Sequence, residues 1–168
     1  MAADLHVRQR GLLAPELNGT VVFMAGVDML GSHTALLVAR MAEAVIAYDP
    51  DIVEDVNFGT QAYNAMHEGM YKVDALAQLG YGLPITPIVG RFPLEESPEE
   101  ICSKALDSVD FPTKVLISGV DSFGARRQLA QWAQEHDIRD VDYSNGNSES
   151  FNEGVRQYAE EVQEEEAE

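Results

Sequence analysis

The 168 residues suffice for one domain of ordinary size, and the 45% that are apolar can form a buried core. The 29 acidic and 11 basic residues give a net charge of −18, which argues against a nucleic-acid-binding protein or one that docks on anionic membranes. No apolar run is long enough to span a membrane, Met1–Arg10 is too polar for a signal peptide, and the single cysteine excludes an intrachain disulfide. We therefore expect an acidic cytoplasmic protein.

Strands and helices alternate along the predicted chain. Short β-branched apolar runs predict the strands, and apolar residues at helical spacing predict the helices. In chain order the elements are strand 20–25, helix 31–41, strand 45–48, helix 61–65, helix 71–79, strand 85–89, helix 97–108, strand 114–118, helix 126–135 and strand 140–143. The alternation predicts a Rossmann-like three-layer α/β/α domain with a mostly parallel sheet of about five strands.

The end of the chain differs in composition from the rest. Residues 148–168 contain eight glutamates and one arginine, with apolar residues at helical spacing. We divide the chain into a Rossmann-like domain over 1–147 and an acidic helix or tail over 148–168. A helix packed on the domain is favoured over a helix that binds a partner.

Two strand ends carry residues typical of nucleotide binding. Gly26 and Gly31 match the outer glycines of the dinucleotide fingerprint, but Asp28 stands where backbone approaches phosphates. A carboxylate there repels phosphate, so a tight turn without a ligand is the alternative. Asp49 ends the second strand, where an acid holds ribose hydroxyls in Rossmann-like folds, or alternatively caps a loop.

The residues after the second strand carry a more specific pattern. The segment Asp49–Asn57 resembles the Asp-x-Asp-x-Val-x-x-x-Asn element of the ThiF/MoeB/HesA superfamily, the ubiquitin-activating-enzyme-like adenylyltransferases. Further elements follow the family's order: Val7-Arg8-Gln9 before the first strand, Gln61, Gly69–Lys72, and Asp121–Arg126 after the fourth strand. Several short elements in the right order are more specific than any one of them.

The resemblance implies an activity and a set of residue roles. Such enzymes bind ATP and Mg²⁺ and adenylate the C-terminal carboxylate of a ubiquitin-like or sulfur-carrier protein. Catalytic roles would fall on Arg8, which would act across a homodimer, on Lys72 at the phosphates, and on Asp121, which would also hold Mg²⁺. Nucleotide-binding roles would fall on Gly26, Gly31, Asp49, Asn57, Gln61 and Lys72.

Departures from the family pattern support a second hypothesis. Asp28 adds a negative charge at the phosphates, Thr60 replaces an arginine, and Ser122 replaces an asparagine. The chain also ends about 25 residues after the fifth strand, so we expect little of the family's partner-binding crossover loop. The alternative function is a catalytically inactive ThiF-like dimerisation or scaffold protein, in a homodimer or in a viral or multi-subunit assembly. An ordinary NAD-dependent enzyme is a weaker third interpretation.

Other chemically notable side chains have ordinary interpretations. We expect Cys102 to be a small buried residue and Trp132 to belong to the core. His67 is expected on the surface. Arg126 and Arg127 are adjacent and point apart on a helix, so either both lie in solvent or one of them reaches a dimer partner or the end of the sheet.

Overall fold

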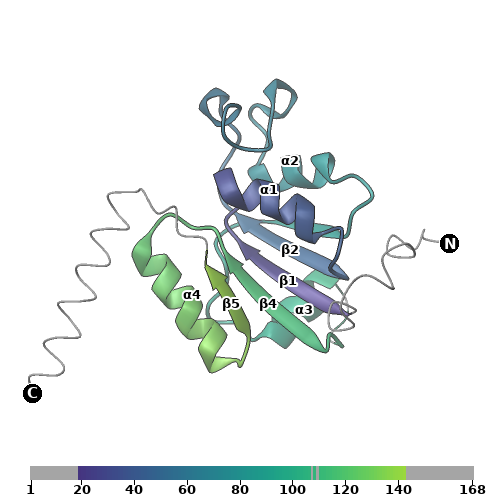
Figure 1. Ribbon diagram of the computed structural model, residues 1–168, viewed down its shortest axis with the longest axis vertical. Coiled ribbons are helices and arrows are strands. Elements are labelled where there is room, and N and C mark those ends of the chain that lie inside the picture. Colours follow the sequence, from purple (N-terminus) through teal and green to yellow (C-terminus); the bar gives the residue numbers. More distant parts are fainter. Residues whose placement is uncertain (1–18, 107, 109, 143–168) are drawn as a thin grey trace, which may run out of the picture.

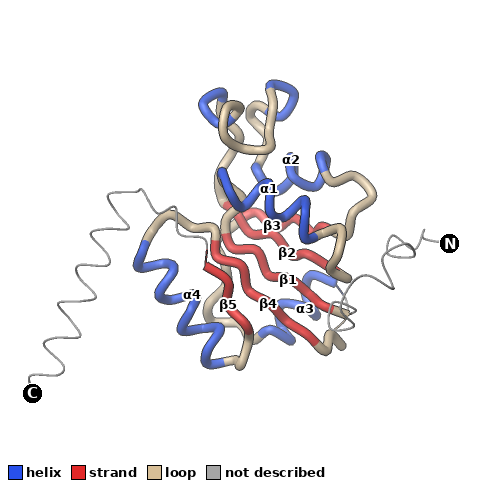
Figure 2. Tube along the Cα trace, viewed as in Figure 1, coloured by secondary structure: helices blue, strands red, loops and turns tan. Residues whose placement is uncertain are grey.

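The computed structural model of the protein describes residues 19–106, 108 and 110–142. Within these ranges, five parallel strands form one sheet in the order β3-β2-β1-β4-β5 (Figures 1 and 2). The strands are β1 (Thr20–Ala25), β2 (Ala44–Asp49), β3 (Ile85–Val89), β4 (Thr113–Ser118) and β5 (Arg139–Asp142). The helices are α1 (Met29–Val38), α2 (Lys72–Leu79), α3 (Pro98–Leu106) and α4 (Phe123–Glu135). The predicted α/β architecture is confirmed.

Helices cover both faces of the sheet and create two cores. Alternate residues of β1 and β2 point to opposite faces, so Val22 and Met24 join α1 and α2 in one core. Val21 and Phe23 join α3 and α4 in the other. All twelve residues of β1 and β2 are buried, which explains why both strands read as continuous apolar runs.

The order of the strands creates a switch point beside β1. The chain moves from β1 through α1 to β2 and then outward to β3, and it returns to pair β4 with the other side of β1. Loops that follow β1 and β4 therefore leave in opposite directions at the same edge of the sheet. In open parallel sheets, ligands bind at this position.

All five predicted strands are confirmed, but the helix predicted at 61–65 is wrong. The segment between β2 and α2 instead contains two single 3₁₀ turns, Asp55–Asn57 and Ala65–His67, and projects beyond the sheet (Figure 2). Asn64 explains the interruption, because its side chain accepts a hydrogen bond from Met66 N (3.0 Å) and its backbone N–H donates to His67 Nδ1 (3.2 Å). Such local side-chain bonds compete with a continuous helix.

Two groups of sequence predictions lie outside the described residues. These are Arg8 with its flanking element, and the acidic tail with the domain boundary at residue 147. No helix of the described ranges has the length and apolar composition needed to cross a membrane.

Candidate functional site

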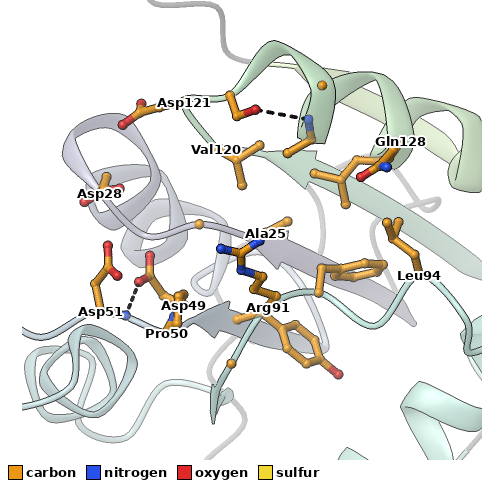
Figure 3. A pocket seen from close by; sticks show the side chains of 18 residues that line it. Ala25, Asp28, Asp49, Pro50, Asp51, Arg91, Leu94, Val120, Asp121 and Gln128 are labelled. Atoms are coloured by element: carbon orange, nitrogen blue, oxygen red, sulfur yellow. Dashed lines mark hydrogen bonds between the residues drawn. The ribbon is translucent and has the colours of Figure 1, made fainter.

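A pocket of about 590 Å³ opens at the carboxyl ends of β1, β2, β3 and β4 (Figure 3). The first turns of α4 close its other side through Gly124, Ala125 and Gln128. A second pocket of about 170 Å³ adjoins it, and Asp28 and Asp121 line both. The pocket lies at the switch point, where the topology places a ligand.

The predicted glycines shape the turn between β1 and α1. Gly26 has a φ of +89°, and a Cβ there would approach Gly119 backbone atoms at 3.0 Å. A Cβ on Gly31 would lie 2.3 Å from the carbonyl oxygen of Gly26. Both glycines are therefore required for close backbone packing, a sufficient reason for them whether or not a ligand binds.

Asp49 connects the end of β2 to this turn. Its Oδ2 accepts a hydrogen bond from Val27 N (2.8 Å), and its Oδ1 accepts one from Asp51 N (2.9 Å). Burial raises the pKa of the Asp49 carboxyl, and the two N–H donors and Lys72 offset this rise only in part. The carboxyl lines the pocket, and each oxygen retains a lone pair for a ligand hydroxyl.

Lys72 is paired inside the protein. It begins α2, is buried, and forms an ion pair with Asp28 and a longer contact of 3.4 Å with Asp51 Oδ2. Gln61 Nε2 donates to the same Asp28 Oδ1 at 3.2 Å. Burial by itself lowers the pKa of Lys72, but the hydrogen bond from Lys72 to Asp28 and the surrounding carboxylates raise it overall. The lysine is therefore charged, and it lines neither pocket.

The other predicted nucleotide-binding residues are not gathered at one place. Gly26, Asp49 and Asp121 line the main pocket, and Gln61 lines the adjoining one. Asn57 lines neither pocket, and its Oδ1 accepts a hydrogen bond from Glu54 N (2.8 Å) in a 3₁₀ turn. Gly31 does not line either pocket.

Asp121 follows β4 and is exposed at the pocket edge. In the part of the chain that the structure describes, no group of three or more His, Cys, Asp or Glu side chains is placed to hold a metal ion. The magnesium role of Asp121 therefore remains a prediction.

Sequence reasoning missed Arg91, which enters the main pocket from the loop after β3 (Figure 3). Its position two residues after the strand was the available signal, because strand ends meet at this edge. Among the described residues, the main pocket is lined by one arginine and by four aspartates: Asp28, Asp49, Asp51 and Asp121. This lining favours neutral or cationic ligand groups.

Four other side chains discussed from the sequence are all buried: Cys102, Trp132, His67 and Arg126. Cys102 and Trp132 are buried in the core as predicted, and Trp132 Nε1 donates to Glu96 O (2.9 Å). His67 is buried, so its predicted surface position is wrong. Arg126 is also buried and donates from Nε to Val120 O at 2.7 Å, which confirms the sheet-end alternative over the solvated one.

Solved structures support the fold but leave the activity open. No protein-family model and no curated protein matches the chain. The Escherichia coli tRNA N6-threonylcarbamoyladenosine dehydratase TcdA, solved with ATP, has a TM-score of 0.63 at 18% identity, over 84% of this chain and 61% of that one. E. coli MccB with ATP has a TM-score of 0.57 at 14% identity, over 77% and 38%, and PaaA one of 0.56 at 18% identity, over 77% and 39%.

TcdA, MccB and PaaA share the fold of this chain, so the Rossmann-like fold predicted from the strand order and the motifs is confirmed. The chain spans about three fifths of TcdA and less than two fifths of MccB or PaaA. At these identities the likeness concerns the fold alone.

Proposed function

We propose that this chain is a catalytically inactive ThiF-like protein that binds an adenine nucleoside or nucleotide in the strand-end pocket. Its role would be that of a dimerisation or scaffold module in a cytoplasmic assembly. The observation that carries the proposal is the position of Lys72, whose amino group is committed to Asp28 and does not line the pocket.

The part of the pocket formed by Asp49, Tyr48 and Phe92 supports the binding of a nucleoside. Asp49 lies at the end of β2, oriented by two backbone N–H groups, with lone pairs left for hydroxyl donors. Phe92 and Tyr48 give the pocket an aromatic wall, and the volume of about 590 Å³ falls in the range of small-molecule sites. TcdA, which shares the fold, was solved with ATP and with AMP.

The residues that would have to contact the phosphates do not fit the adenylation reaction. Transfer at phosphorus depends on positive charge placed on the phosphoryl oxygens. Lys72 is neutralised by Asp28, Thr60 stands in place of an arginine, and Asn57 is engaged in its own loop. The described residues thus offer a triphosphate few cations and several carboxylates. For this reason we assign no catalytic step to the chain.

A second candidate function is ATP- and Mg²⁺-dependent adenylation of the C-terminal carboxylate of a ubiquitin-like or sulfur-carrier protein. The observation that favours it is the location of Asp49 and Asp121 at the pocket, where the motif resemblance places the ribose and magnesium ligands. In that case Arg8 would act from the second subunit of a homodimer.

Two measurements separate these functions. Thermal unfolding of the full chain is compared with adenosine, AMP and ATP·Mg, because a ligand at 100 times its Kd adds about 2.7 kcal/mol of stability. Pyrophosphate exchange is then assayed with candidate carrier proteins. The proposal expects stabilisation by an adenine ligand and no exchange. Exchange that Lys72→Ala abolishes would establish the second function, and stabilisation by no ligand would leave only the scaffold role.

A further inference from the structure

We infer that the Asp28 carboxylate is a built-in anion at the phosphate end of the pocket, so that the pocket selects an adenine nucleoside and discriminates against its 5′-triphosphate. This inference rests on the proposed function, because it concerns the ligand preference of the same pocket. It makes Asp28 a specificity-determining residue for which the motif resemblance provides no role.

The surroundings of Asp28 are those of an anion site. Asp28 is the N-cap of α1, so it lies at the positive end of the helix dipole, and its side chain makes no capping hydrogen bond to the helix. Lys72 Nζ and Gln61 Nε2 both donate to its Oδ1. A helix N-terminus combined with a cation and an amide donor is an arrangement that binds phosphate. Here the chain supplies the anion itself.

The position of Asp28 in the pocket wall explains how the Asp28–Lys72 ion pair affects phosphate binding. Asp28 lines both the main pocket and the adjoining one, so a ligand group that extends from one to the other must pass it. Figure 3 shows Asp28, Asp51 and Asp121 gathered at one end of the pocket, while Arg91 and Leu94 lie further along. A phosphate chain that points toward α1 therefore meets the Asp28 carboxylate, which is 28% exposed, whereas the charge of Asp51, 61% exposed, is screened by solvent.

A bound phosphate would compete with Asp28 for Lys72. If the phosphate took the lysine, Asp28 would lose its charged partner while remaining beside the new anion. If Asp28 kept the lysine, the phosphate would be left facing carboxylates. A charge-assisted contact contributes about 1.5–3 kcal/mol, so either outcome lowers triphosphate affinity about 10- to 100-fold while leaving nucleoside contacts intact.

The test is calorimetric titration of the wild-type chain and three variants with adenosine and with ATP·Mg. In Asp28→Gly the carboxylate is absent, and in Asp28→Asn the shape is kept without the charge. Asp51→Asn is the matched control, because it removes the same charge from the same pocket and from the same lysine, but leaves the Asp28–Lys72 pair intact. Circular dichroism confirms that each variant is folded.

We expect wild type to bind adenosine at least about 10-fold more tightly than ATP·Mg. Either Asp28 variant should raise ATP·Mg affinity about 10- to 100-fold with adenosine affinity changed less than about threefold, and Asp51→Asn should raise it less than about threefold. A merely structural Asp28 would not alter the ratio of the two affinities.

Several results would overturn the inference while leaving the proposed function intact. These are equal wild-type affinities for adenosine and ATP·Mg, an unchanged ratio in the folded Asp28 variants, or an equal effect of Asp51→Asn. If wild type binds neither adenosine nor ATP·Mg, the ligand-binding part of the proposed function fails, and the inference fails with it.

Discussion

Lys72 and Asp28, which are 44 residues apart in the chain, form an ion pair that joins the start of α2 to the start of α1. Lys72 is almost fully buried, while the Asp28 side chain keeps 28% of its exposure at the pocket wall. The pair therefore does two things: it fixes the long segment between β2 and α2 against the β1–α1 turn, and it withholds the lysine charge from a ligand.

Because the Lys72–Asp28 ion pair joins two parts of the fold, we expect a large coupling free energy between these side chains in unfolding. Lys72→Met leaves Asp28 without its cation, and we expect it to lower the free energy of unfolding by about 1–3 kcal/mol. The double variant Lys72→Met/Asp28→Asn should recover part of this loss. Urea unfolding of the wild type, both single variants and the double variant gives the coupling energy. Coupling below about 0.5 kcal/mol would mean that the pair contributes little to the fold.

Asp49 predicts an unusual dependence of stability on pH. Because burial raises its pKa in the folded state, its carboxyl favours folding when protonated, and this contribution is lost as pH rises from the ordinary Asp range through the raised folded pKa. The unfolding free energy of wild type minus that of Asp49→Asn should therefore fall over this window. A difference that instead grows with pH would show that the two N–H donors dominate and lower the pKa.

Tyr63 anchors the segment between β2 and α2 to the turn after β1. Its hydroxyl is buried and donates to Val27 O at 2.7 Å, beside the pocket turn. Tyr63→Phe should lower the unfolding free energy by about 0.5–1.5 kcal/mol, because a buried carbonyl loses its donor. Tyr81→Phe is the control, since Tyr81 is 95% exposed and should change nothing measurable. Equal effects of the two variants in denaturant unfolding would contradict this anchor.

Gly31, in the first turn of α1, should be sensitive to an added side chain whether or not a ligand binds. Gly31→Ala places a Cβ against the carbonyl oxygen of Gly26, and we expect a loss of about 1–3 kcal/mol of stability as the turn shifts. Gly59→Ala is the matched control, because no atom lies within 4 Å of the added Cβ. Thermal unfolding of both variants measures the difference. A stable Gly31→Ala protein would show that the turn has room to relax.

Local sequence patterns predicted most of the fold. The apolar runs at β1 and β2 are continuous because both faces of these strands are buried, and Asp49 was placed at the pocket by the rule for strand ends. Asp28 was also recognised from the sequence as an obstacle to phosphate, because it interrupts the glycine frame.

Interactions between distant residues could not be predicted in the same way. The pairing of Lys72 with Asp28 depends on how α2 packs beside α1, which no local pattern encodes. The missing helix at 61–65 reflects Asn64 and the contacts of Gln61 with Asp28, which outweigh a short helical pattern. His67 and Arg126 are polar side chains that the fold buries and bonds, whereas residue type alone favours the surface.

Because Lys72 is committed to Asp28, its ammonium group is not available to a phosphate. The decisive measurement is nitrogen-15 NMR of the Lys72 ammonium group, recorded for wild type and Asp28→Asn with and without millimolar ATP·Mg. We expect the signal to shift in Asp28→Asn and to stay in place in wild type when ATP·Mg is added. A wild-type signal that moves on addition of ATP·Mg would show that the lysine reaches the phosphates, and would contradict its commitment to Asp28.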